Sequence, residues 1–294
     1  MAQYSFLKEA NLYLVKDNAR YLIDISNVSF NQTFTEETYK VQNLHTSDIF
    51  EGSVIVQANP ANFSFTCFVL KEVDHKVVFN SLIDIFTFDL YVQTRQDTFK
   101  LEQCVSTNGN FNISKGKTLT LEISGEASKL SRVGTDSYII PGVPQARVGK
   151  TYLIAKDTSI VLDSISISEH TSTLNLEIQN EVSWVPYKTL NAGVLGEVSY
   201  PSTFSLDKRT VAGSILRYIN PETDSDVQTY STSSSLHIKI GQEIGGTFYG
   251  FDFNMGSCSY TNRINTGAIF THNYDWRMTD NSTSLDNIIN YITT

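Results

Sequence analysis

The chain has 294 residues, of which 40% are hydrophobic and 12% aromatic, and its formal net charge is −9. This length suits two domains of ordinary size, and no apolar run of about 18 residues that could span a membrane occurs in it. The acidic balance argues against affinity for nucleic-acid backbones, which requires clustered Lys and Arg.

The first half of the chain predicts a series of strands and one helix. Alternation is clearest in residues 118–123, where Leu119, Leu121 and Ile123 would face a core and the residues between them solvent. From Asp74 to Phe86, apolar residues recur at helical spacing behind an Asp that can cap the helix. Further strands are expected at 38–41, 53–56, 63–70 and 88–92.

The second half predicts strands with a helix near its middle and another at its end. Residues 209–219 are expected to form the first helix, which Pro221 would end. A short C-terminal helix is expected behind Ser284, because apolar residues there follow the i, i+3, i+4, i+7 pattern. Strands are expected at 175–178, 197–200, 236–240, 247–253 and 268–273.

Two segments are too long and too polar for tight turns. They are residues 31–52 and 170–196, and both mix polar residues with Phe, Val or Trp184. Connections of more than about 12–15 residues are usually functional or disordered. We interpret both segments as extended hairpin arms that reach a neighbouring molecule.

The two halves also share an ordered set of matching residues, which suggests an internal duplication. Tyr13 matches Tyr152, Pro60 matches Pro201 and Cys104 matches Cys258, while the offset grows from 139 to 154 residues. Between the halves lies a Pro- and Gly-rich stretch typical of a linker. The sequence thus predicts one domain at 1–135, a linker at 136–150 and a second domain at 151–294.

The two halves differ in charge. Residues 1–150 carry 14 basic and 16 acidic residues, whereas residues 151–294 carry 8 and 15. The negative charge is therefore concentrated in the second predicted domain.

The sequence predicts no catalytic, cofactor-binding or metal-binding residue. Its three cysteines stand far apart and are expected to be buried and reduced, since no secretion signal is evident. The histidines are scattered, and the Gly-rich stretch 241–246 lies between predicted strands, which favours a turn over a phosphate site. The remaining candidates are two short Ser-x-x-Lys matches (Ser5–Lys8 and Ser205–Lys208) and an acidic loop containing Asp224 and Asp226.

One stretch carries a resemblance to a known family. Residues 99–130, FKLEQCVSTNGNFNISKGKTLTLEISGEASKL, resemble the closing strands of the tail tube domain of long-tailed bacteriophages. The order of a strand, a polar arm, a Pro-x-x-Phe-Ser strand and a helix extends this likeness along most of the chain. Residues 258–276 depart from it, because they lack the clean Leu-x-Leu-x-Ile alternation.

The resemblance implies a mainly β fold, with two tandem β-sandwich or barrel domains that each carry a flanking helix. It implies a structural subunit of the tail tube and no enzyme. Six such domains close into a ring, so a chain with two domains would form it as a homotrimer. Stacked rings would conduct DNA without binding it specifically, and no cofactor is implied.

The partners that the resemblance implies are further copies of the chain and other tail proteins: tape measure, baseplate, terminator and, where present, a sheath. The location would be the virion tail, with assembly in the host cytoplasm. Two alternatives stay open. One is a tube-like protein that caps the stack at the baseplate or tail end, and the other is a carbohydrate-binding β-sandwich from a tail fibre.

Overall fold

The computed structural model describes residues 9–42, 49–113, 116–185, 198–219, 234–279 and 284–294. The described part is mainly β, as predicted, and holds one α-helix, α1 (Lys76–Ile83). Two short 3-10 helices are η2 (Val73–His75) and η3 (Ser168–His170). The strands are β1 (Asn11–Lys16), β2 (Ala19–Ile23), β3 (Ile25–Asn31), β4 (Phe34–Gln42), β5 (Ile49–Ala58), β6 (Ala61–Phe68), β7 (Phe88–Gln93), β8 (Thr98–Asn112), β9 (Thr120–Ala127), β10 (Lys129–Gly134), β11 (Val143–Pro144), β12 (Ser159–Leu162), β13 (Ile165–Ser166), β14 (Thr171–Val185), β15 (Thr203–Tyr218), β16 (Ser234–Ile244), β17 (Thr247–Asn265), β18 (Thr271–Met278) and β19 (Ile289–Ile292).

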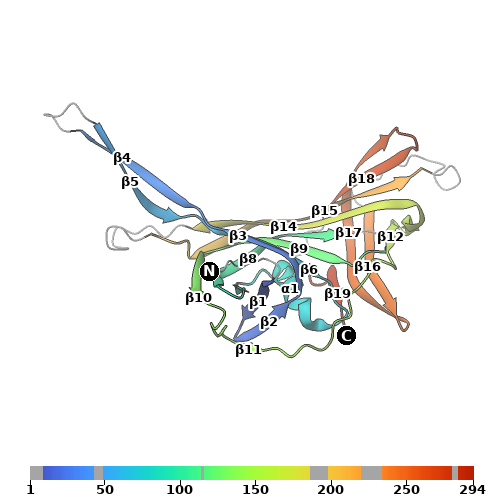
Figure 1. The fold of residues 1–294 in the computed structure, drawn as a ribbon. Helices are drawn as coiled ribbons and strands as arrows, with labels where there is room; N and C mark the ends of the chain where they lie inside the picture. The colour runs from blue at the N-terminus through green and yellow to red at the C-terminus, as the bar shows by residue number, and fades with distance from the viewer. Residues whose placement is uncertain (1–8, 43–48, 114–115, 186–197, 220–233, 280–283) are drawn as a thin grey trace.

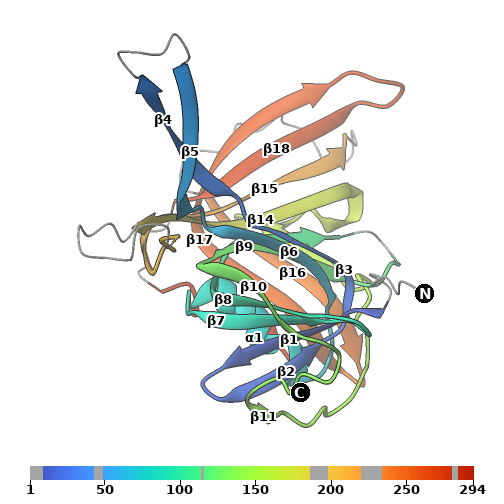
Figure 2. The same ribbon diagram turned by 60° about the vertical axis from the view of Figure 1, so that its left-hand side comes forward.

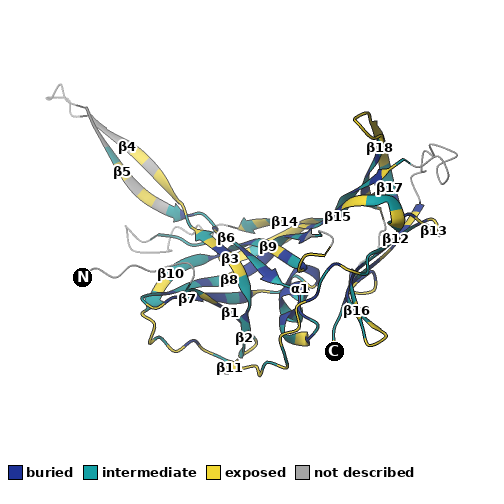
Figure 3. Ribbon diagram, turned by 45° about the vertical axis from the view of Figure 1, so that its right-hand side comes forward, coloured by how far each residue is buried: buried dark blue, intermediate teal, exposed yellow. Residues whose placement is uncertain are grey.

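Strand β8 passes from a smaller sheet into a larger one. Its first half pairs with β7 and β10, and its second half pairs with β9 and β14. Gln103 lies between the halves with a φ of 53°, a left-handed conformation that bends a strand at a bulge. Figures 1 and 3 show the larger sheet across the middle of the molecule, with α1 and the smaller sheet beneath it; Figure 3 labels β1, β2 and β7 of this smaller sheet.

The same order of antiparallel pairing occurs twice along the chain. In the first series the order is β2, β1, β7, β8, β9, β6, β3, with β10 beside the start of β8. In the second series it is β13, β12, β16, β17, β18, β15, β14, with β19 beside the start of β17. The two series join where β8 pairs with β14, so one sheet continues through both.

Individual residues occupy matching places in the two series. Cys104 pairs with Phe88 next to a register shift in β7, and Cys258 pairs with Ser234 next to the same shift in β16. Tyr13 lies within β1, whereas Tyr152 forms an isolated bridge with Leu70. The match of Cys104 with Cys258 therefore agrees with the pairing order, and the match of Tyr13 with Tyr152 does not.

The hydrophobic core is continuous between the two series. Its centre is an aromatic cluster in which the ring of Phe111 lies 4.8 Å from that of Phe251 and 5.3 Å from that of Phe253. Phe79 of α1 and Tyr291 of β19 complete the cluster at 5.8 Å from each other. Aromatic pairs at these distances add to the stability that burial provides, so the two series hold each other in place.

Two predicted helices are wrong. Residues 209–219 belong to strand β15, and the C-terminal segment forms a turn followed by β19. Val211 and Ile215 are four residues apart, a spacing that fits a helix and also one face of a strand. These residues form a strand because they pair with β14 on one side and with β18 on the other. The predicted helix at 74–86 is confirmed in its central part by α1.

The predicted strand at 197–200 is also wrong for the residues that are described. Ser199 forms only an isolated bridge with Gln57, and Glu197 lies outside the described residues. The other predicted strands overlap observed ones, and residues 268–273 contain only the first residues of β18. Both ends of β18 are set by its partners β15 and β17.

The stretch from 135 to 150 contains only the two-residue strand β11 and crosses the first series along β2. Arg147 fastens it by donating two hydrogen bonds to the Asp24 carboxylate, at 2.9 and 3.0 Å. Burial raises the pKa of Asp24, but the bond and charge of Arg147 outweigh it and the net pKa is lowered. The connection is thus packed against the first series.

Candidate assembly surfaces

The larger sheet has one buried face and one open polar face. Along β9, Leu121 and Ile123 point into the core, whereas Glu122 and Glu126 point the other way. The same alternation along β14 and β18 leaves Glu177 and Asp275 on the open face, because residues opposite one another in a sheet share a face. The open face therefore carries carboxylates from both series.

Hydrogen bonds between side chains cover much of this open face. Glu177 accepts bonds from Asn108 at 2.9 Å and from Gln179 at 2.6 Å. The Trp184 indole donates to Glu126 at 2.7 Å; burial raises the pKa of Glu126, while this bond acts against that rise. Strands β9 and β14 contain no Lys or Arg among their described residues, so these two strands offer a phosphate no cation on this face.

Two hairpins rise at opposite ends of the open face (Figures 1 and 3). Strands β4 and β5 form a separate two-stranded sheet that leaves the body of the molecule, as Figure 2 also shows. It exposes Phe34 and Ile55, at 46% and 47%. Since an isolated hairpin is marginally stable in water, this arm is suited to packing against another molecule.

The hairpin of β17 and β18 carries the second group of exposed apolar residues. Ile264, Ile269 and Phe270 are 46%, 62% and 56% exposed. The prediction of a hairpin arm within residues 31–52 is confirmed for its described part. The corresponding prediction for 170–196 is confirmed for β14, which pairs with β15 as far as Val185, whereas residues 186–197 lie outside the described residues.

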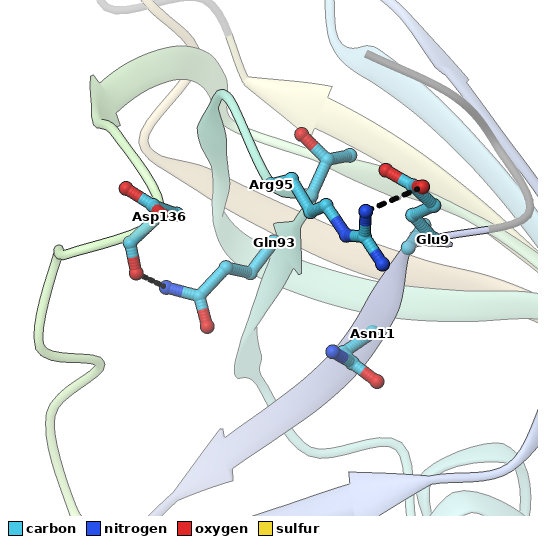
Figure 4. A pocket seen from close by; sticks show the side chains of 7 residues that line it. Glu9, Asn11, Gln93, Arg95 and Asp136 are labelled. Carbon is cyan, nitrogen blue, oxygen red and sulfur yellow. Dashed lines mark hydrogen bonds and ion pairs between the residues drawn. The ribbon is translucent and has the colours of Figure 1, made fainter.

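The edge of the smaller sheet holds a polar pocket of about 500 Å³ between Glu9, Gln93, Arg95 and Asp136. Figure 4 shows Arg95 turned toward Glu9, an ion pair of 3.3 Å, and Gln93 bonded to Asp136. The bond from Gln93 goes to the backbone carbonyl of Asp136. Among the described residues that line the pocket there is no Ser, Cys or Lys beside a base, as catalysis by a side-chain nucleophile would need.

The other residues singled out in the sequence lie apart from one another. His75 is buried beneath the first series, and His237 bonds to Asp252 at 2.6 Å on the second. Gly245 and Gly246 form the β16–β17 turn with φ values of 62° and 80°, so the Gly-rich stretch is a turn. Ser205 and Lys208 lie on either side of a register shift in β15, and the Ser205 hydroxyl donates to the Asp207 carboxylate at 3.0 Å. Ser5–Lys8, His45, Asp224 and Asp226 lie outside the described residues.

The three cysteines are buried thiols, as predicted. Burial raises the pKa of Cys67 to about 12 and raises that of Cys104 well above its usual value. Within the described ranges, no group of three or more His, Cys, Asp or Glu side chains could hold a metal ion. None of the helices described is long and apolar enough to cross a membrane.

The model of one protein family, described as the bacteriophage baseplate tube protein family, matches residues 71–293. The chain belongs to this family. It is therefore a structural protein of the phage tail and a component of the virion, which confirms the coarser part of the resemblance to tail tube domains. No match was found among curated proteins.

The sequence did not reveal which strand edges stay open. The free side of β3 and the last part of β17 have no described neighbouring strand. Local alternation reports which face of a strand is buried, but the number of neighbours depends on pairing between distant segments.

Proposed function

We propose that three copies of this chain close into a ring that forms a section of the DNA channel at the baseplate. The chain would supply two of six similar units, joined by the connection at 136–150. The observation that carries the proposal is the repeated pairing order, together with the continuous sheet made where β8 meets β14. A contact that joins two units in one chain can also join units of different chains.

In this ring the open polar face lines the channel. Its exposed Glu122 and the partly exposed Glu177 and Asp275 repel the phosphates of DNA. Arg263 also lies on this face, and the ion pair that it forms with Asp275 neutralises its charge. DNA would pass without specific binding, and assembly would take place in the host cytoplasm.

A second candidate is the major tail tube subunit, in which such rings stack many times. The observation that favours it is the β4–β5 hairpin, whose exposed Phe34 and Ile55 could pack against the next ring. At the baseplate the same hairpin would contact a neighbouring tail protein, such as another baseplate protein, the tape measure or the terminator. The family description favours the baseplate position.

Negative-stain electron microscopy of the purified full chain tests these proposals. We expect rings of three chains with a central hole. Single rings would support the baseplate position, whereas long tubes formed by the chain alone would support the major tube. A monomer that never assembles at any concentration and binds glycans on an array would contradict both, and would favour the carbohydrate-binding alternative.

A further inference from the structure

We propose that the ring closes through antiparallel pairing of the end of β17 in one chain with β3 in the next. This inference rests on the proposed ring and specifies its contact. In the first series, the second half of β8 pairs with β9 on one side and with β14 on the other. In its counterpart β17, residues 263–265 pair with β18 on one side, and none of the described strands pairs with them on the other.

The complementary edge belongs to β3. In the second series, β14 pairs with β15 and uses its other side for β8. Its counterpart β3 pairs with β6, and among the described strands its other side is open. Among the described strands, β8 and β14 thus form one junction between the two series. Strands β3 and β17 hold the corresponding positions and could form a second junction between two chains.

The complete junction also fixes the register of the missing one. There, Asn110 is opposite Glu177, Phe111 opposite Leu176 and Asn112 opposite Asn175. Cys104 and Cys258 occupy the same place in β8 and β17. Strand β8 has one extra residue at the register shift between Ser106 and Asn108, and the pairing of β17 with β18 has no such shift. Allowing for this extra residue, Ile264 of β17 occupies the place of Phe111 in β8. Counting through β15 and β6 places Phe30 where Leu176 lies. The inferred pairs are Arg263 with Asn31, Ile264 with Phe30 and Asn265 with Ser29 of the next chain.

The exposed fractions of Phe111 and Ile264 differ as expected if Ile264 becomes buried only when a second chain pairs with β17. Phe111 is 3% exposed because it packs across the junction against Phe253, at 5.3 Å. Ile264, in the corresponding place, is 46% exposed. An exposed β-branched apolar residue at an open strand edge is a liability unless a partner covers it.

A receiving surface of the right chemistry lies beside β3. The rings of Phe30 and Phe99 are 5.3 Å apart and only partly buried. Phe99 occupies the place of Phe253, since each pairs with a matching residue of β7 or β16. Ile264 of one chain would therefore pack against Phe30 and Phe99 of the next, as Phe111 packs against Leu176 and Phe253 within the chain.

Disulfide trapping tests the register. Cysteines replace Asn31 and Arg263, which lie on the open face and would be directly opposite, with Cβ atoms about 4.5–5.5 Å apart. The matched control pairs Arg263→Cys with Asn27→Cys, on the same face of β3 but about 13 Å further along it. After mild oxidation we expect a non-reducing gel with a ladder that ends at three chains for the first variant and monomer for the control.

A second variant tests the apolar contact. Ile264→Asp should lower the fraction of assembled rings about tenfold or more at equal protein concentration, while the melting temperature of the monomer stays near that of the native chain. Ile139→Asp is the control, because Ile139 is 86% exposed away from both edges, and its rings should persist.

The outcomes separate this inference from the proposed ring. If the native chain forms three-chain rings but the control pair cross-links as well as the first pair, or Ile264→Asp assembles like the native chain, the inferred contact is wrong and the ring stands. If the native chain forms no ring, the proposed function fails and this contact fails with it.

Discussion

His75 is the buried residue through which pH should act on the stability of the first series. It is 3% exposed, its Nδ1 donates to the Phe68 carbonyl at 2.8 Å, and its Nε2 accepts from the Asp24 amide at 3.1 Å. This geometry requires a neutral ring. Burial lowers its pKa, and the Arg147 charge lowers it further, while the Phe68 bond and the charges of Asp24 and Asp74 act in the opposite direction.

Because the folded pKa lies below the unfolded value of about 6.5, the unfolded chain binds the proton more readily. The stability that neutral His75 contributes is complete above pH 6.5 and is lost as pH falls, by up to about 1.4 kcal/mol per pH unit. Thermal unfolding of the native chain and of His75→Gln from pH 5 to 8 measures this. The variant should show a weaker pH dependence in that window, and equal slopes would contradict the assignment.

Asn180 joins the two series through the C-terminal end of α1. Its Nδ2 donates to the carbonyls of Leu82 at 2.9 Å and Ser106 at 3.1 Å, and its Oδ1 accepts from Arg209. Replacing Asn180 by Ala leaves buried carbonyls without these donors and should cost about 1–3 kcal/mol of unfolding free energy. Denaturant unfolding measures this, with Gln179→Ala on the exposed face as the control, expected within about 0.5 kcal/mol. Equal losses in both variants would exclude this role of Asn180.

At the scale of elements, the β4–β5 hairpin is separate from the core. A chain in which residues 35–57 are replaced by a short Gly-Ser turn should keep a melting temperature close to that of the native chain. The two strands of the hairpin form a sheet of their own, and the pairing that links this sheet to other described residues is the isolated bridge of Gln57 with Ser199. The shortened chain should also still form rings, since β3 and β17 stay intact. A large fall in melting temperature would show that the hairpin supports the fold, and loss of rings would show that it closes them.

Strands with clean alternation were predictable from the sequence, and the two misassigned helices show where such prediction ends. In β9, Leu121 and Ile123 alternate with polar residues and allow one interpretation. In β15, the apolar spacing satisfies the strand and helix periods together, and only the pairing with β14 and β18 separates them. The hairpin arm at 31–52 was foreseen because its length and polarity excluded a tight turn.

The strand edges proposed for assembly, on β3 and β17, could not be predicted from the sequence for a different reason. Whether Ile264 lies in a core or at an open edge depends on a neighbour that is distant in the chain or belongs to another molecule. The match of Cys104 with Cys258 carried part of this information, since Cys104 precedes the half of β8 that pairs with β14 and Cys258 precedes the corresponding half of β17. The match of Tyr13 with Tyr152 pointed to a different alignment and would have given the wrong register.

At the scale of the whole molecule, the described strands of the chain form one junction between the two series, β8 with β14, and the proposed ring uses β3 and the end of β17 for a second. In a single chain, none of the described strands covers the edge of β3 or the end of β17. Closing three chains into a ring covers both edges in every copy, which removes the exposed strand edges that promote aggregation. Because each chain would supply two similar units, three chains would fill the six positions of the ring.

The most direct test of this account is native mass spectrometry of the full-length chain, combined with class averages from electron microscopy of the same sample. The account predicts a closed species of three chains with a central hole and pseudo-sixfold outline. A stable species with two, four or six chains, or a monomer at every concentration tested, would contradict it.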